Sequence, residues 1–298
     1  MAPTERYLRL TALAQRAFSR GRLERSLHLF EAAEGEARRG GDRELVDRAF
    51  CNRCVVLAEL DRLDSVSAEL KHILMRSRDP FTAWMAAYYT SQAYEAEGVI
   101  SRALAYARRA SELAEICGQP RSLAASGNQQ GVLALKESKF AEAAQCFELV
   151  LRLDSEHSGD VIGSAITRDN LGYCLMCTGR VSEGMALCCE AAAVIESVGA
   201  RQYLPEIYQD ICYGALQLQR YAEGRMWGEK ALALAREYDH QGVERNTLML
   251  LADAAMDEGD EEAGEKYLDL LASHYPDLKG MKSFFAAFNV REVINLKA

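Results

Sequence analysis

The sequence predicts an all-α solenoid of about seven helix-turn-helix repeats, and three observations lead to that prediction. Apolar and small residues recur at helical spacing on both sides of Gly179. The same pattern returns along the chain at intervals near 40 residues, and small residues recur at fixed positions within each copy. Two helices of this length bury only one face each against the other, so each pair needs a copy of itself on either side.

The clearest copy runs from Ile166 to Ala191, with one helix before the turn at Thr178-Gly179-Arg180 and a second helix after it. Sliding this pattern along the sequence places the turn between the two helices at Gly21, Asp61, Gly98, Ser138, Gly179, Gln219 and Gly259. Subtraction gives intervals of 40, 37, 40, 41, 40 and 40 residues. The copies therefore cover nearly the whole sequence.

Three columns of residues within the copies predict where the helices cross. Seven residues before each turn the side chain is small: Ala14, Cys54, Ser91, Gly131, Gly172, Cys212 and Ala252. Five residues after the turn stand Ser26, Val66, Ala103, Ala143, Gly184, Gly224 and Gly264, which are small in all but the second copy. Twelve residues after it the column is apolar: Ala33, Ile73, Ala110, Val150, Ala191, Ala231 and Leu271. Small residues let two helices approach closely, so we expect the helices of each copy to cross at the first two columns.

From about Tyr7 to Pro276 the sequence resembles the tetratricopeptide repeat family. The resemblance is carried by Leu171-Gly172, by Gly131, by the glycine-type turns and by runs such as Phe140-Ala141-Glu142-Ala143-Ala144. It implies a right-handed superhelix in which the first helix of each repeat lines a concave groove.

Two features of the family pattern are reduced in this sequence. The large aromatic residue four positions before the turn survives only as Tyr94, and the closing proline appears only as Pro276. Without a proline to stop it, the second helix can continue for about six more residues, which lengthens the period from the usual 34 to about 40. This long form resembles repeats of kinesin light chains, of spindle-orientation adaptors and of bacterial peptide-sensing regulators.

The sequence shows no domain boundary before about residue 277, so we expect one repeat array over 1–276 and a distinct segment over 277–298. In that segment Phe284, Phe285 and Phe288 are spaced to share one helix face. The last repeat of an array has an open apolar side, which a carboxy-terminal capping helix would cover. Self-association through the three phenylalanines is the alternative.

Composition and charge narrow the class of partner. The formal net charge is -9 with a pI near 5.3, which disfavours nucleic acid and anionic membrane surfaces as partners. No run approaches the length of a membrane span, and the start of the chain lacks the apolar core of a signal peptide. The nine cysteines lie mostly inside helical patterns, so we expect reduced thiols and a cytoplasmic location.

The sequence contains two Cys-x-x-Cys pairs but no recognisable catalytic motif. The pairs Cys51/Cys54 and Cys174/Cys177 are three repeats apart, too far to converge on one zinc ion, and Cys54, Cys188 and Cys212 fall on packing columns. The five histidines are scattered over different repeats. We therefore expect no enzyme activity, no metal and no cofactor, with a metal or redox role for the cysteine pairs as the least favoured alternative.

The exposed stripe on the first helices is the most informative surface, because residues three and four apart share one helix face. The predicted partner-binding residues are Tyr88, Gln92, Asn128, Gln129, Asp169, Asn170, Tyr173, Gln209 and Tyr213, and Asp210 adjoins them. Carboxamides can donate to and accept from a peptide backbone, and tyrosines add contact area. Asp169 and Asp210 would repel the acidic chaperone tails that some relatives bind.

We therefore predict a non-catalytic scaffold or adaptor that binds an extended peptide or a helix of a partner protein in the concave groove. The alternative is a peptide-sensing regulator that acts on a separate output partner in transcription or signalling.

Overall fold

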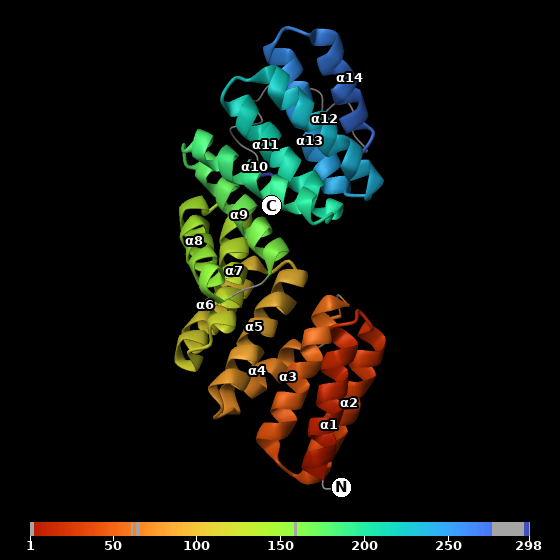
Figure 1. Cartoon of the computed structure of the whole chain (residues 1–298), viewed down its shortest axis with the longest axis vertical. Helices are drawn as coiled ribbons and strands as arrows, with labels where there is room; N and C mark the ends of the chain where they lie inside the picture. Colours follow the sequence, from red (N-terminus) through yellow and green to blue (C-terminus); the bar gives the residue numbers. More distant parts are fainter. Residues whose placement is uncertain (1–2, 61, 64–65, 158–159, 276–294, 298) are drawn as a thin grey trace. The chain divides into compact units, whose positions relative to one another are not determined.

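The structure is a computed structural model that describes residues 3–60, 62–63, 66–157, 160–275 and 295–297. Every regular element among these residues is helical (Figure 1). The helices are α1 (Pro3–Phe18), α2 (Leu23–Gly40), α3 (Arg43–Glu59), α4 (Ser67–Arg76), α5 (Pro80–Ala96), α6 (Ile100–Cys117), α7 (Pro120–Lys136), α8 (Phe140–His157), α9 (Val161–Cys177), α10 (Val181–Ser197), the short 3-10 helix η1 (Arg201–Tyr203), α11 (Leu204–Gln217), α12 (Tyr221–Glu237), α13 (Gln241–Asp257) and α14 (Glu261–Ala272). The all-α prediction is confirmed.

The turns inside the repeats lie where the sequence places them. The left-handed backbone conformation that ends each first helix is adopted by Gly21, Gly98, Ser138, Gly179, Gln219 and Gly259, with φ between 58° and 92°. The remaining predicted turn residue, Asp61 of the second repeat, lies outside the described residues. Ser138 and Gln219 adopt a conformation that glycine takes without steric cost, so the repeat geometry overrides local preference there.

The second helices are long, as the missing prolines predict: α2, α6 and α8 each span 18 residues. The exceptions are α14, which spans 12 residues, and α4, which spans 10 residues and ends shortly before Pro80. Pro80 opens α5, and Asp79 caps that helix by accepting a hydrogen bond from the Thr82 backbone N–H at 2.9 Å.

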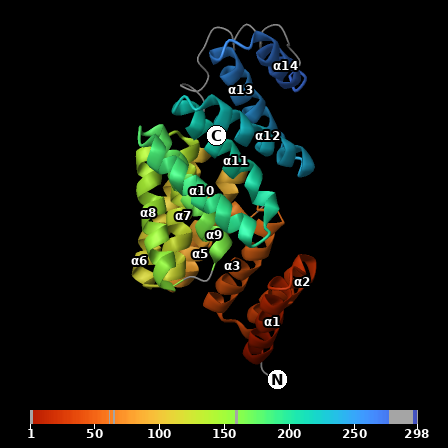
Figure 2. The ribbon, with the colours of Figure 1, turned by 45° about the horizontal axis from the view of Figure 1, so that its top comes forward.

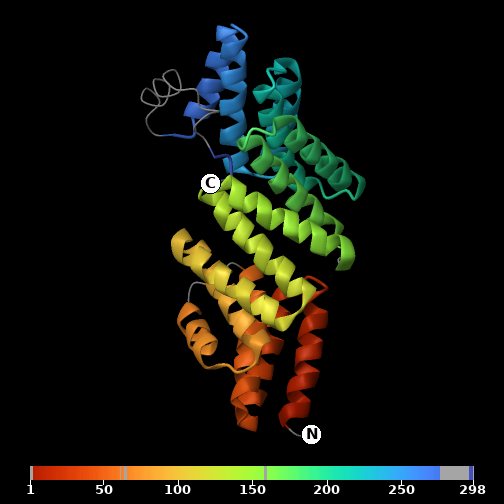
Figure 3. The same ribbon diagram turned by 90° about the vertical axis from the view of Figure 1, so that its left-hand side faces the viewer.

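The chain forms two compact units, residues 1–133 and 134–298, and the boundary falls inside α7. In unit 1 α2 packs on α3, α4 packs on α5, and α3 also contacts α5 (Figure 3). In unit 2 the first helices α9, α11 and α13 contact one another in order, while α10 and α12 pack on the helices that follow them (Figure 2). This is the stacking of helical hairpins that the repeat pattern predicts.

The predicted crossing columns are confirmed by close backbone approaches. A Cβ atom on Gly172 would lie 2.6 Å from the carbonyl oxygen of Gly184, and one on Gly184 would lie 2.3 Å from the carbonyl oxygen of Gly172. In two other repeats a serine uses the same proximity, because the Ser26 hydroxyl donates to the Ala14 carbonyl at 2.9 Å and the Ser91 hydroxyl to the Ala103 carbonyl at 2.8 Å. Small residues at these columns are therefore a packing requirement.

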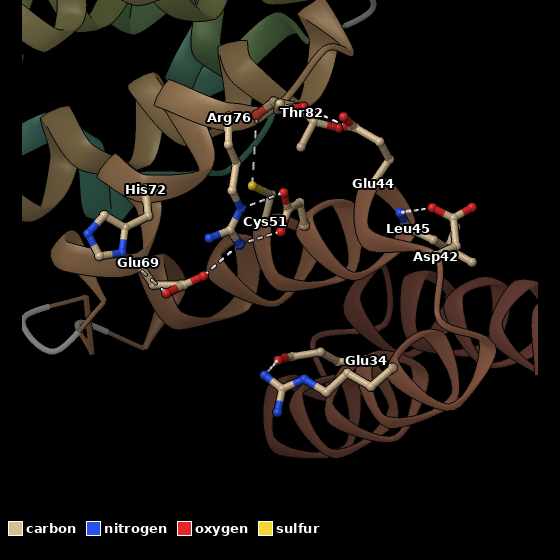
Figure 4. A network of polar contacts seen from close by, with 12 residues as sticks. Glu34, Asp42, Glu44, Leu45, Cys51, Glu69, His72, Arg76 and Thr82 are labelled. Carbon is tan, nitrogen blue, oxygen red and sulfur yellow. Dashed lines mark hydrogen bonds and ion pairs between the residues drawn. The ribbon is translucent and has the colours of Figure 1, made fainter.

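An ion pair with a buried aspartate attaches the end of the short helix α4 to α3 in unit 1 (Figure 4). Arg76, the last residue of α4, donates two hydrogen bonds to Asp47 of α3, at 3.0 and 2.5 Å, and one to Glu69 at 2.7 Å. Just beyond it, the Ser77 hydroxyl and the Arg78 backbone N–H both donate to the Glu44 carboxylate. These bonds fix the end of α4 and the loop after it to α3.

The predicted segment at 277–298 lies largely outside the described residues, and with it Phe284, Phe285 and Phe288. Of that segment only residues 295–297 are described, and they lie in unit 2. None of the described helices has the length and apolar character needed to span a membrane.

Candidate functional site

In unit 1, Tyr88, Gln92 and Gln129 of the predicted stripe contact side chains of the same unit. The Tyr88 ring stacks on Trp84 with centroids 5.5 Å apart, and the Gln92 amide donates to the Tyr88 hydroxyl at 3.2 Å. The Gln129 amide, on α7, donates to the Glu95 carboxylate on α5 at 2.7 Å. Burial raises the pKa of the Tyr88 hydroxyl to about 12, so the group stays a neutral hydrogen-bonding phenol. In this unit much of the polar stripe is already used for internal bonds.

The predicted stripe residues of unit 2 are buried. Asp169, Asn170 and Tyr173 lie on α9 with exposed fractions of 2%, 9% and 0%, and Gln209 and Tyr213 lie on α11 with 1% and 3%. The sequence predicts an exposed stripe here, and in unit 2 that prediction is wrong. The Tyr173 and Tyr213 rings lie 5.6 Å apart, so the aromatic residues of neighbouring repeats pack together.

Residues Asn295, Leu296 and Lys297, here called the tail segment, contact this buried stripe. The Leu296 backbone N–H donates to the Tyr173 hydroxyl at 2.9 Å, and the Asn246 amide on α13 donates to the Leu296 carbonyl at 3.0 Å. The Asn295 amide donates to the Leu135 carbonyl, at the end of α7, at 2.7 Å. The tail segment therefore crosses the first helices of four consecutive repeats, next to the chain end marked in Figure 1.

Lys297 brings a positive charge against three carboxylates. Its ammonium lies 2.7 Å from Asp210, 3.1 Å from Asp169 and 4.0 Å from Glu206. The same ammonium lies 5.9 Å from the centroid of the Tyr173 ring, within reach of a cation–π interaction. Asp169 and Asp210 are almost fully buried, so the lysine supplies the countercharge that such groups need.

The pKa values in this cluster follow from burial and mutual charge. Burial raises the pKa of Asp210 well above its ordinary value, and the neighbouring Asp169 raises it further while Lys297 opposes the shift. For Lys297, burial acts to lower the pKa, but Asp169, Asp210 and Glu206 together raise it well above its ordinary value. The lysine is therefore held in its charged form.

We call the residues that contact the tail segment from α9, α11 and α13 the tail-binding face: Asp169, Tyr173, Glu206, Asp210 and Asn246. Glu206 and Asn246 are not among the site residues predicted from the sequence. Both stand thirteen positions before the turn of their repeat, one helical turn before the predicted stripe. Extending the stripe by one turn toward the start of each first helix would have included them.

Among the described residues, Oδ1 of Asp169 and Oδ1 of Asp210 on the tail-binding face, and Oε1 of Gln209 next to Asp210 on α11, are buried without a hydrogen-bond partner. A buried acceptor without a donor costs free energy, so a ligand group that donated to these oxygens would be favoured.

Five of the nine cysteines are buried in the core and the other four are partly buried. Cys54, Cys188 and Cys212 are fully buried, as expected of small apolar residues at packing positions. Burial raises the pKa of Cys54 to about 12 and that of Cys177 to about 11, so neither is a reactive thiolate at neutral pH. Within the described part of the chain, no three histidine, cysteine or carboxylate side chains gather in a group that could hold a metal ion.

A surface pocket of about 360 Å³ lies elsewhere in unit 2, with Asp154, Asp160, Ser164 and Arg168 in its lining. Asp154 accepts a hydrogen bond from Ser164 at 3.0 Å, and Asp160 caps α9 through the Gly163 backbone N–H at 2.9 Å. The polar groups of this pocket thus have structural roles, and none of the predicted site residues lines it.

The chain has the fold of a tetratricopeptide repeat solenoid. RapI in its apo form matches it with a TM-score of 0.69 at 10% identity, over 94% of this chain and 79% of that chain. A Rap protein complexed with competence and sporulation factor matches with a TM-score of 0.69 at 11% identity, over 97% and 84%. A signal-transduction ATPase from Pyrococcus horikoshii with a tetratricopeptide repeat sensor gives 0.65 at 15% identity, over 97% of this chain and 45% of that chain.

These likenesses show the shared fold. No protein-family model and no curated protein matches the sequence.

Proposed function

We propose that this protein is a non-catalytic interaction protein whose second unit binds a segment of a partner protein on the tail-binding face. The observation that carries the proposal is the tail segment itself. Its main chain is held by the side chains of Tyr173 and Asn246, and its lysine by Asp169 and Asp210. A face that holds one short peptide segment through backbone bonds and an ion pair has the chemistry to hold another.

The fold likeness supports this proposal. A Rap protein has been solved in complex with competence and sporulation factor, and its fold covers 97% of this chain. A cytoplasmic location is part of the proposal and agrees with nine cysteines that lie mostly within helical patterns.

Asn170, Gln209 and Tyr213 lie beside the tail-binding face and would contact a partner segment longer than the tail segment. Tyr88, Gln92, Asn128 and Gln129 of unit 1 stay predicted partner-binding residues. Because Gln92 and Gln129 already donate internal hydrogen bonds, we expect them to contribute less binding energy than the residues of unit 2.

The experiment is affinity capture with the full chain carrying Asp169→Asn and Asp210→Asn, which remove two charges while keeping side-chain shape. Glu183→Gln is the matched control, because Glu183 is an exposed carboxylate of unit 2 that pairs with Arg180. We expect a partner captured by the unmodified chain and the control to be lost with the double variant. A partner retained equally by all three proteins would contradict the proposed site.

A further inference from the structure

The tail segment offers this face three different recognition elements. Its main chain is bound by side chains on both sides of Leu296, which fixes position without reading sequence. Leu296 itself is 5% exposed, so an apolar side chain suits that place. The Lys297 side chain is 10% exposed and meets carboxylates from α9 and α11.

The shape of the tail segment is a turn. The Lys297 backbone N–H donates to the side-chain oxygen of Asn295 at 3.0 Å, which closes an Asx-type turn around Leu296. The turn points the leucine and the lysine in the directions that the contacts require. An asparagine, an apolar residue and a lysine in direct succession are therefore the pattern that this face holds.

Electrostatics makes the lysine the most restrictive element. Asp169 and Asp210 are buried on neighbouring helices, and Glu206 adds a third negative charge within 4.0 Å of the ammonium. Without a cation the two aspartates would face each other in a medium of low polarity. A segment that replaces the tail segment keeps both aspartates ionised at low cost only if it brings a cation with it.

We propose that the tail segment is an internal ligand of the tail-binding face, and that the partner segment this face accepts carries an apolar residue followed directly by a lysine. This inference rests on the proposed function and specifies its ligand. The tail segment and a partner segment compete for the same residues, so the intact chain binds a free peptide weakly. Loss of the tail contacts raises the affinity.

The test uses a fluorescein-labelled peptide with the sequence of residues 291–298, Arg-Glu-Val-Ile-Asn-Leu-Lys-Ala, and fluorescence anisotropy. The tethered tail competes at a high effective concentration, so we expect the full chain with Lys297→Ala to bind the peptide at least about 10-fold more tightly than the unmodified chain. A second variant, Leu296→Asp, weakens the tail by a different contact and should raise the affinity in the same direction.

The specificity arms use altered peptides and an altered face. Replacing the peptide lysine by alanine, or exchanging the order of leucine and lysine, should reduce affinity for the Lys297→Ala chain by at least about 10-fold. Adding Asp169→Asn and Asp210→Asn to that chain should have the same effect, whereas Glu183→Gln should leave the affinity unchanged. Equal binding by unmodified and Lys297→Ala chains, or equal binding of the native and alanine peptides, would overturn the inference.

Folding is controlled by thermal unfolding of each variant. If Lys297→Ala lowers Tm, saturating native peptide should raise it again, because a ligand that binds only the folded chain stabilises it. Absence of both binding and a Tm response would also refute the inference.

The outcomes separate this inference from the proposed function. Capture of a partner through Asp169 and Asp210 without peptide binding supports the function and rejects the ligand pattern. If the peptide binds but the chain with Asp169→Asn and Asp210→Asn still captures every partner, the internal ligand is supported and the proposed function is rejected.

Discussion

The two units bury carboxylates in the same kind of place but neutralise them differently. In unit 1 Asp47, on the first helix of its repeat, is 1% exposed and pairs with Arg76, 29 residues away on the second helix of that repeat. In unit 2 Asp169 and Asp210 pair with Lys297, which is 128 residues from Asp169 and lies beyond the last repeat. In unit 1 the countercharge therefore comes from the same repeat, whereas in unit 2 it comes from a segment beyond the last repeat, which we propose a partner segment can replace.

Polar residues on the first helices therefore have different contacts in the two units. In unit 1 Tyr88, Gln92 and Gln129 bond within the array and stabilise it. In unit 2 the equivalent stripe holds a segment from outside the repeats. A cation stabilises the buried carboxylates in either case, and in unit 2 we propose that a partner molecule can supply it.

The largest expected effect is from Arg76→Ala in unit 1. It leaves Asp47 buried without its cation, and we expect the free energy of unfolding to fall by about 3–5 kcal/mol. Urea unfolding of the variant measures the loss. No added peptide should restore it, since the missing group belongs to a helix; restoration by the peptide of residues 291–298 would remove the contrast between the units.

Lys297→Ala should cost less, about 3 kcal/mol, since burial already raises the pKa of Asp210 and a proton can replace the lost cation. A carboxyl whose folded pKa is raised stabilises the fold below its ordinary pKa, and that stability is lost as pH rises through the raised value. The deficit in Tm against the unmodified chain should therefore be smaller at pH 5 than at pH 8. A deficit independent of pH would show that Asp169, Asp210 and Glu206 do not limit stability there.

Gly184→Ala tests the close helix crossing of unit 2. The new Cβ would lie 2.3 Å from the Gly172 carbonyl oxygen, so α9 and α10 must separate, at a cost of about 1–3 kcal/mol. Gly35→Ala in α2 of unit 1 is the control, since a Cβ there meets nothing within 4 Å. The control should gain about 0.5–1 kcal/mol, because alanine favours a helix interior. Denaturant unfolding gives both values, and a loss at Gly35 equal to that at Gly184 would contradict the crossing.

The smallest effect is expected from Asn246→Ala, which removes one neutral hydrogen bond to the Leu296 carbonyl. In the Lys297→Ala background it should weaken binding of the peptide by about 1 kcal/mol, roughly fivefold in Kd. Anisotropy titration measures it. An effect as large as that of Asp169→Asn with Asp210→Asn would mean that the backbone contact, and not the charge, dominates recognition.

The repeats can be predicted from the amino-acid sequence alone. Periodic small residues such as Gly172 and Gly184 encode the crossing of two helices, and the same spacing placed the turns even where Ser138 and Gln219 occupy the left-handed position. Those features depend on residues within one repeat or between adjacent repeats, which a period can reveal. Helical spacing also predicts that Asp169 and Asp210 make the stripe acidic.

The residues that contact this stripe, in contrast, cannot be predicted from the sequence pattern. Lys297 bears no periodic relation to Asp169 or Asp210, and no local pattern marks Asn295-Leu296-Lys297 as their partner. On sequence the stripe was expected to be exposed, whereas in the folded chain it is buried with the tail segment against it. The physical reason is separation along the chain. Helix periodicity specifies which side chains share a face within a repeat. A buried charge, however, can be neutralised by any cation that the fold brings near, however distant it is in the sequence.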